Sequence, residues 1–218
     1  MTMKLVIGNK NYSSWSMRPW LAMRASGIAF EEIFIPLYTG EADKRRILDV
    51  SKSGKVPALI DGDVTVWDSL AIIEYLTEKF PDAQLWPTDR AARAYARSVS
   101  AEMHSGFAAL RNECGMNLHR PIAAKVLSES ARADIARVQE IWSDCRARHG
   151  KSGPFLFGKF TAADAMYGPV VHRFQTYAIE LTLPVRDYME AMQSQPAFAE
   201  WTAAGLAETI VIDKFETD

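Results

Sequence analysis

The chain has 218 residues, which is enough for one large domain or two small ones with a substantial core. Hydrophobic residues make up 48% of the sequence and charged residues 24%, which is typical of a globular protein and excludes a disordered chain. With 25 Lys and Arg against 27 Asp and Glu, the net charge is −2. We therefore expect neither nucleic acid nor an acidic surface to be the main partner.

The two cysteines and the apolar runs limit the protein further. Cys114 and Cys145 lie outside any CxxC or Cys/His pattern, so they predict buried thiols in a reducing compartment, without a disulfide or a metal site. Residues 1–8 lack the pattern of a secretion signal, and no stretch reaches the ~20 apolar residues of a membrane helix. We expect a cytoplasmic protein with no membrane partner.

The first 80 residues alternate short apolar runs with helical patterns. Asp61-Gly62 between two apolar runs is a strong signal for a β-hairpin. The predicted elements are a strand over 4–8, a helix that begins near Trp20 and ends at Gly27, a strand over 30–37, a helix over 41–50, hairpin strands over 56–60 and 64–66, and a helix from Asp68 to Phe80. The predicted order is βαβαββα.

Everything after a linker over 81–87 has helical periodicity. Thr161 and Asp164 form a capping-box pattern at the start of one predicted helix. The other predicted helices are a long one with an apolar stripe at Tyr95, Val99, Met103, Phe107 and Leu110, a second long one over 122–149, and shorter ones near Pro184 and Pro196. The sequence thus predicts an α/β domain over 1–80 and an all-helical domain over 88–218.

A serine-rich turn between the first strand and the first helix is the first candidate site. Hydroxyls at a helix N-terminus favour a nearby anion, and Ser13, Ser14 and Ser16 all lie there. The alternative is that one of them is simply the N-cap, for which Ser16 is the first choice, with Pro19 in the first turn. No Gly-x-Ser-x-Gly motif or Ser/His/Asp set is evident, which argues against a serine hydrolase.

Two further positions are suited to holding a small peptide. Pro57 opens a predicted strand, where it indicates an edge or an unusual peptide geometry. A cis bond there would leave the backbone of Val56 free to pair with an extended ligand, whereas the alternative is an ordinary loop proline. Asp68 and Ser69 start a helix, where they could cap it or hold an amine and a carboxylate.

Together these features resemble the cytosolic glutathione S-transferases over nearly the whole chain. The resemblance rests on the Ser-Ser-x-Ser-x-Arg turn, Gly-Lys-Val-Pro, the Asp-Ser-Leu-Ala-Ile-Ile-Glu-Tyr-Leu helix, and the Thr161 and Asp164 box after Gly158. It is closest to serine-type members, particularly the zeta class with its maleylacetoacetate isomerases. Trp15 stands where that class has a cysteine of the isomerase chemistry. The resemblance therefore implies transferase chemistry more strongly than isomerase chemistry.

The resemblance implies a fold, a cosubstrate and a reaction. The first domain would be thioredoxin-like and bind glutathione, and the second would supply most of a pocket for a small hydrophobic electrophile. The thiolate of glutathione would attack that electrophile or assist an isomerisation. A homodimer and no metal are also implied. The alternative is a noncatalytic protein that binds glutathione, another ligand or a partner protein, because this fold also serves such roles.

The resemblance also implies which residues bind glutathione. Ser13 matches the catalytic serine when counted back from Arg18, and Ser14 is the alternative. Val56 would pair with the cysteinyl residue, Asp68 and Ser69 with the γ-glutamyl end, and Lys55 with the glycine carboxylate, for which Lys44 or Arg45 are alternatives. The implied glutathione-binding residues are Ser14, Trp15, Lys55, Val56, Pro57, Asp68 and Ser69.

The implied pocket for the second substrate lies between the domains. Its candidate residues are Trp15, Met103, His104, Phe107 and Arg111. For Met103 and Phe107 the alternative is core packing, because a stripe at helical spacing usually faces a core.

Overall fold

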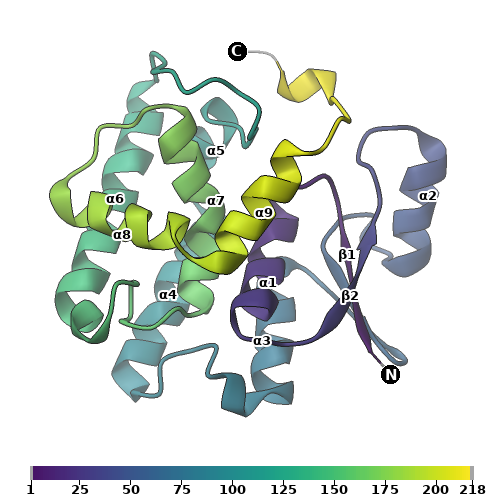
Figure 1. Cartoon of the computed structure of the whole chain (residues 1–218), viewed down its shortest axis with the longest axis horizontal. Helices are drawn as coiled ribbons and strands as arrows, with labels where there is room; N and C mark the ends of the chain where they lie inside the picture. Colours follow the sequence, from purple (N-terminus) through teal and green to yellow (C-terminus); the bar gives the residue numbers. More distant parts are fainter. Residues whose placement is uncertain (1, 217–218) are drawn as a thin grey trace.

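A computed structural model describes residues 2–216, with a small sheet beside a bundle of helices (Figure 1). The expected βαβαββα order and the helical second half are confirmed. The first elements are β1 (Met3–Ile7), α1 (Ser14–Ala25), β2 (Phe30–Phe34), α2 (Glu41–Val50), β3 (Ala58–Asp61), β4 (Val64–Trp67) and α3 (Ser69–Lys79).

The sheet has the strand order β2-β1-β3-β4. β1 runs parallel to β2 and antiparallel to β3, and β3 runs antiparallel to β4. Val6 is paired with Ala58, and Ala58 with Trp67. The end of β1, the start of β3 and the end of β4 therefore lie at the same end of the sheet.

Helix α1 differs from the sequence prediction at its start. It begins at Ser14, and its N-cap is Ser13, whose Oγ accepts a hydrogen bond from Ser16 N at 3.4 Å. The prediction that Ser16 caps the helix is wrong, because its Oγ instead accepts from Gly8 N at 3.1 Å. Pro19 consequently lies inside the helix, beyond the first turn.

Two strands, β2 and β3, are shorter than predicted. β2 ends at Phe34, just before Pro36, which has no N–H with which to continue a ladder. The peptide bond between Val56 and Pro57 is cis, and β3 begins directly after it. Val56 thus lies outside the strand.

The helical half begins with a short 3₁₀ turn, η1 (Pro81–Ala83). The capping box is confirmed: Thr161 N and Oγ1 donate to Asp164 Oδ2 at 2.7 and 2.9 Å. The remaining elements are α4 (Arg90–Ser105), α5 (Ala108–Glu113), α6 (Glu129–His149), η2 (Gly150–Ser152), α7 (Ala162–Thr176), α8 (Leu183–Gln193), α9 (Pro196–Leu206) and η3 (Asp213–Phe215).

Two predicted helices have the wrong extent. The predicted long helix through Leu110 breaks after α4, because Phe107 has a left-handed backbone with φ of 56°. The second long helix begins at Glu129, where the Ser128 Oγ accepts from Ala131 N at 3.1 Å, so residues 122–127 are not helical. Val126 in that segment is 95% exposed, so its apolar character did not indicate burial.

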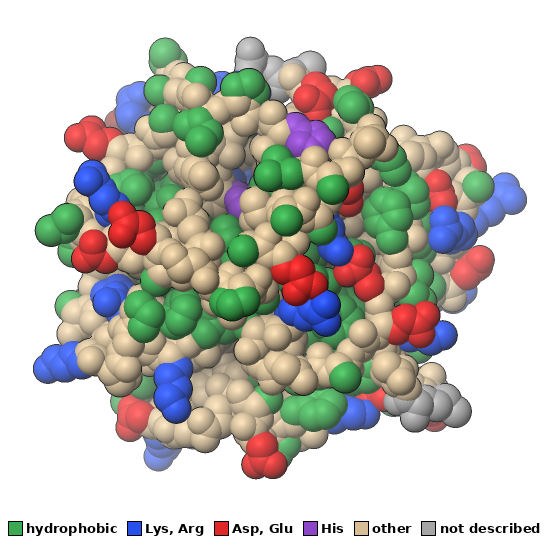
Figure 2. Space-filling view, in the orientation of Figure 1, with side chains coloured by type: hydrophobic (Ala, Val, Ile, Leu, Met, Phe, Trp, Pro, Cys, Tyr) green, Lys and Arg blue, Asp and Glu red, His purple; other side chains and the backbone are tan. Residues whose placement is uncertain are grey.

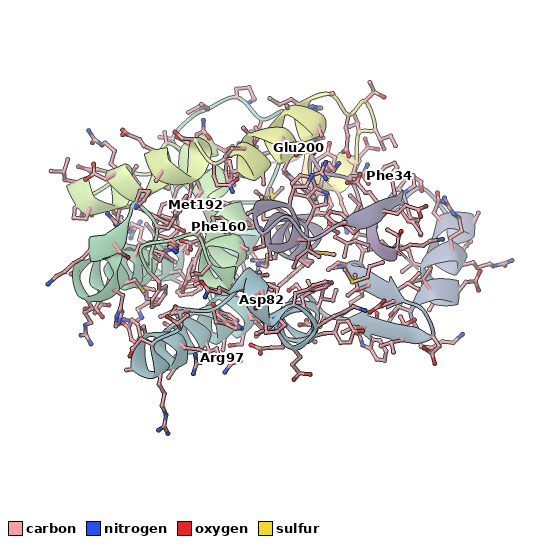
Figure 3. The ribbon with its side chains drawn as sticks, turned by 60° about the horizontal axis from the view of Figure 1, so that its bottom comes forward. Phe34, Asp82, Arg97, Phe160, Met192 and Glu200 are labelled. Carbon is pink, nitrogen blue, oxygen red and sulfur yellow. The ribbon has the colours of Figure 1, made fainter. Side chains whose placement is uncertain are left out.

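One large core joins the two halves. α1 lies between the sheet and the bundle in Figure 1, and the core includes Trp20 of α1, Trp142 of α6 and Trp201 of α9. A smaller cluster with Ile47 of α2 covers the opposite face of the sheet. Glu200, labelled in Figure 3, extends from α9 to α1, where Arg24 donates to it at 2.7 Å. Helix α1 therefore packs against the sheet on one side and against the helical bundle on the other.

The surface agrees with the near-neutral charge. Acidic and basic side chains are intermixed over the face shown in Figure 2, without a broad area of one sign. Within residues 2–216, no helix has the length and apolar character needed to cross a membrane.

Candidate functional site

The serines lie in and after a tight loop, residues 9–13, which we call the serine loop. Tyr12 N and Ser13 N both donate to Asn9 O, at 3.1 and 2.7 Å. Ser13 and Ser14 are 7% and 9% exposed. The Ser13 hydroxyl donates to Ser16 Oγ at 2.8 Å, so it would have to rotate to donate to a ligand.

The sheet register places the other predicted glutathione residues at the same end. Val56 is half-buried and Pro57 is buried directly before β3, while Lys55 is exposed to solvent. Asp68 follows β4 and is the N-cap of α3, with Oδ1 accepting from Leu70 N at 2.9 Å. Backbone and side-chain groups of three separate segments therefore meet at this end of the sheet.

Ser69 carries a buried hydroxyl. Its side chain lies in the first turn of α3, and the residue is 1% exposed. Its Oγ has no hydrogen-bond partner among residues 2–216. A buried polar group without a partner is costly, so a ligand that supplied one would be favoured here.

His104, at the end of α4, links the helical half to Asp68. Its Nε2 lies 2.7 Å from Asp68 Oδ2, and the ring of Trp15 meets the His104 ring edge-on with centroids 5.3 Å apart. Burial raises the pKa of Asp68. The hydrogen bond and charge interaction with His104, together with the hydrogen bonds from Leu70 N and Ala71 N, outweigh burial, so this pKa lies below its ordinary value. The carboxylate form of Asp68 is therefore favoured.

Two guanidinium groups lie over the ring of Trp15. The Cζ of Arg18 lies 4.1 Å from the centroid of the Trp15 ring, and that of Arg111 lies 4.8 Å away.

Arg18 is buried and donates to Met166 O at 2.9 Å and to Ser14 O at 3.0 Å. Burial, followed by the charges of Arg173 and Arg111, holds the pKa of Arg18 well below its usual range. Burial also lowers the pKa of Arg111.

Arg173 is a nearby cation that sequence reasoning missed. It is buried near the end of α7, and its Nη1 donates to Cys114 O and, at 3.2 Å, to Arg111 O. Burial and the charge of Arg111 lower its pKa to about 10. Nothing local in the sequence marks this arginine, because its neighbours come from distant segments. The sequence pattern used Arg18 only as a reference position for Ser13. Its guanidinium lies over the Trp15 ring, which makes it part of the site.

Met103 and Phe107 fit the alternative of core packing. Met103 has no exposed surface, and Phe107 is 7% exposed. Both side chains are thus buried, and their assignment to the second-substrate site stays a prediction. The exposed pair Lys44 and Arg45 lies on α2, where Lys44 contacts Glu41 at 3.5 Å.

Two hollows on the surface lie away from these residues. One hollow lies beside Lys10 and Glu208 and another beside Trp86 and His149, and neither is lined by the predicted glutathione residues. Across residues 2–216, no three or more His, Cys, Asp or Glu side chains are grouped to hold a metal ion.

Comparison with known proteins identifies the family. Residues 12–79 match the model of the glutathione S-transferase N-terminal domain, and residues 94–204 match that of the C-terminal domain. The chain belongs to the glutathione S-transferase family. This confirms the resemblance predicted from the serine turn and the helix of Asp68.

Individual relatives of this glutathione S-transferase chain agree. It is 30% identical over 190 residues to a probable maleylacetoacetate isomerase of Caenorhabditis elegans, covering 85% of this chain and 87% of that one. It is 32% identical over 105 residues to a zeta-class glutathione S-transferase of Euphorbia esula, covering 48% and 47%. The predicted likeness to the zeta class is therefore confirmed. The chain spans about half the length of several curated relatives that it matches.

A solved structure shows the same fold. The chain matches a glutathione transferase homolog from Burkholderia gl BGR1 with bound glutathione, at a TM-score of 0.70 and 23% identity. The match covers 95% of this chain and 100% of that one. The thioredoxin-like domain followed by a helical domain is thus the fold of this glutathione S-transferase.

Proposed function

We propose that the chain binds glutathione at the end of the sheet and activates its thiol for attack on an electrophile. The observation that carries this proposal is the convergence of separate segments: Asp68 contacts His104, which contacts Trp15 of the serine-bearing helix. Val56 lies at the same end of the sheet, as the pairing of Val6 with Ala58 requires.

The proposed chemistry is formation of a thiolate. A free thiol has a pKa of about 8.5, and a hydroxyl donor at a helix N-terminus lowers it by stabilising the anion. We assign this donor role to Ser13, with Ser14 as the alternative. The thiol proton leaves to solvent, the sulfur forms a bond to the electrophilic carbon, and the leaving group departs with the bonding electron pair.

The remaining glutathione contacts follow the peptide from end to end. The backbone of Val56 pairs with the cysteinyl residue in the manner of an added strand. Asp68 accepts from the γ-glutamyl ammonium, and the unpartnered Ser69 hydroxyl donates to the carboxylate. Lys55 is exposed and offers its ammonium to the glycine carboxylate.

The electrophile is assigned to the space beside Trp15, His104 and Arg111. These three residues belong to α1, α4 and α5, which come from both halves of the chain. Trp15, with two guanidinium groups over its ring, occupies the position of the zeta-class cysteine. We therefore propose transfer to a small hydrophobic electrophile ahead of glutathione-dependent isomerisation.

Three broader proposals accompany this one. Residues 1–80 and 88–218 are proposed as two domains joined by 81–87, and two copies as a homodimer. We also propose a cytoplasmic location, for which the free, buried state of Cys114 and Cys145 is the support.

The test is retention on immobilised glutathione together with turnover of an aromatic halide or a peroxide. We expect retention and turnover for the wild type, and loss of turnover with retained binding for Ser13→Ala. Ser105→Ala, on an exposed turn of α4, is the matched control. Failure of the wild type to bind glutathione would reject the site and the mechanism, whereas full activity of Ser13→Ala would move the role to Ser14.

Noncatalytic glutathione binding is the second candidate. The observation in its favour is the Ser13 hydroxyl, which donates to Ser16 Oγ rather than pointing freely at a ligand. Binding without turnover across a broad panel of electrophiles would favour this candidate, and turnover of any one of them would exclude it.

A further inference from the structure

A ten-residue C-terminal tail, residues 207–216, follows α9 and contacts the serine loop. Glu208 Oε1 accepts from Lys10 N at 2.6 Å, and its Oε2 accepts from Asn11 N at 3.1 Å. A carboxylate that accepts from two successive backbone N–H groups makes charge-assisted hydrogen bonds, which are stronger than neutral ones. Glu208 therefore fixes the orientation of the peptide groups just before Tyr12 and Ser13.

A second contact involves the residue directly before Ser13. The Tyr12 hydroxyl donates to Glu216 Oε1 at 2.5 Å, and the Tyr12 ring stacks on Phe215 with centroids 5.5 Å apart. Asn117 Nδ2 also donates to Glu216 Oε1, at 3.0 Å. The tail is thus anchored on the helical half while it holds the side chain of Tyr12.

The tail also reaches the loop between β2 and α2. The ring of Phe215 meets the ring of Tyr38 edge-on at 5.7 Å, and the Lys214 ammonium lies over the Tyr38 ring at 3.2 Å. Tyr38 is 67% exposed, so these contacts leave most of its surface open to solvent. Figure 1 shows the tail extending from the end of α9 toward the loop before α2.

We propose that the tail positions Ser13 for glutathione activation, with Glu208 and Glu216 as positioning residues. This inference rests on the proposed function, because it assigns Ser13 the role of donor to the thiol. Ser13 makes its loop contacts with Asn9 and Ser16, so its orientation depends on the course of residues 10–12. A small misplacement of a donor group is costly in catalysis, since donors must already point at the developing charge.

Glu208→Gln is the sharpest single test. The glutamine keeps one acceptor oxygen but presents an NH₂ group to the second backbone N–H, so one of the two hydrogen bonds is lost. We expect kcat/KM for glutathione transfer to fall by about threefold to tenfold. We also expect the apparent thiol pKa, read from the pH profile of kcat/KM, to rise. Glu190→Gln, the same substitution on an exposed turn of α8, is the matched control.

A double-mutant cycle tests the second contact. Tyr12→Phe removes the hydroxyl and keeps the ring stacked on Phe215, while Glu216→Gln removes the charged acceptor. If the contact acts as a unit, the double variant loses no more activity than the more impaired single variant. Losses that multiply would show that the two residues act independently and would overturn the role of Glu216.

Hydrogen exchange keeps this inference separate from the proposed function. In the chain without glutathione, we expect the amides of Lys10 and Asn11 to exchange about tenfold faster in Glu208→Gln than in the wild type. Unchanged exchange, or an unchanged pH profile with unchanged kcat/KM, would overturn the proposal. Failure of the wild type to bind glutathione would instead reject the proposed function, while the exchange result would still report on the loop.

Discussion

His104 Nε2 lies 2.7 Å from Asp68 Oδ2, and this contact joins the end of α4 to the start of α3. The other oxygen of the same carboxylate caps α3 by accepting from Leu70 N at 2.9 Å. One carboxyl group therefore stabilises a helix terminus, contacts the helical half and faces the position proposed for the γ-glutamyl ammonium. The ionised state of Asp68 strengthens all three interactions.

Replacing His104 with alanine tests this dependence. Burial of Asp68 raises its pKa and His104 lowers it, so without the imidazole we expect the pKa to rise. Because a protonated carboxyl does not hold an ammonium group, glutathione binding should then weaken at a higher pH than in the wild type. An NMR titration of the Asp68 carboxyl carbon measures the shift, with Ser105→Ala as control. Identical titration curves in His104→Ala and the wild type would contradict the expectation.

The elements that could be predicted are those set by local chemistry. The capping box at Thr161 follows from two side chains three residues apart, and the hairpin from Asp61-Gly62 between apolar runs. The start of α1 could not be located, because Ser13 and Ser16 are equally good caps by residue type. The structure distinguishes them because Gly8 N donates a hydrogen bond to Ser16 Oγ, so this hydroxyl does not cap the helix.

The break between α4 and α5 could not be predicted from the apolar stripe, because the stripe continues across it. Gly106 ends α4 and Phe107 has a φ of 56°, yet Met103 and Phe107 both remain buried. Each half of the stripe faces the same core from a different helix. Periodicity alone therefore gave the correct buried face and the wrong number of helices.

Gly106→Ala should destabilise the chain at this break. A Cβ at Gly106 would lie 2.7 Å from the backbone oxygen of Glu102, which is fixed in the last turn of α4. We expect a loss of about 1–3 kcal/mol in the free energy of unfolding, as for other overpacked sites. Urea denaturation measures it. Gly115→Ala is the control, because the nearest atom to its Cβ would be the Tyr177 hydroxyl at 4.0 Å. Equal stability of the two variants would show that the break adjusts freely.

Arg18 shows what sequence patterns do not reveal about the site. Its guanidinium donates hydrogen bonds to two carbonyl groups, those of Met166 and Ser14, and also lies over the ring of Trp15. Met166 lies 148 residues away in the chain, so the partner that explains a fully buried arginine is visible only after folding. The same holds for Arg173 and Cys114.

Arg18→Lys should therefore be a severe substitution. One ammonium group cannot reproduce the planar fork that reaches two carbonyls, nor the stacking on an indole. We expect a loss of about 2 kcal/mol or more, since a buried carbonyl loses its partner. Arg186→Lys, at an exposed position of α8, is the control and should change stability by less than about 0.5 kcal/mol. Thermal and urea denaturation measure the stability of both variants. If Arg18→Lys were as stable as the wild type, the role assigned to the guanidinium fork would be contradicted.

The raised pKa of Asp164 implies that its contribution to stability falls as the pH rises, which is opposite to the usual behaviour of a carboxyl group. Burial raises its pKa from 3.8 to about 6, even though it accepts from Leu156 N at 3.0 Å and from Thr161 N at 2.7 Å. Between pH 4 and pH 6 the folded state keeps this proton while the unfolded chain has lost it. The contribution of Asp164 to stability therefore falls as the pH rises through this window. The whole change, from well below pH 4 to well above pH 6, is about 3 kcal/mol.

Asp164→Asn isolates this contribution, because the amide does not titrate. We expect the difference in unfolding free energy between wild type and variant to shift by about 2 kcal/mol against the wild type from pH 4 to pH 6. Urea unfolding at pH 4, 5, 6 and 7 measures it, with Asp187→Asn on the exposed face of α8 as control. A constant difference across that range would mean that Asp164 is ionised throughout, and that its three hydrogen bonds from Leu156 N, Thr161 N and Thr161 Oγ1 outweigh the cost of its burial.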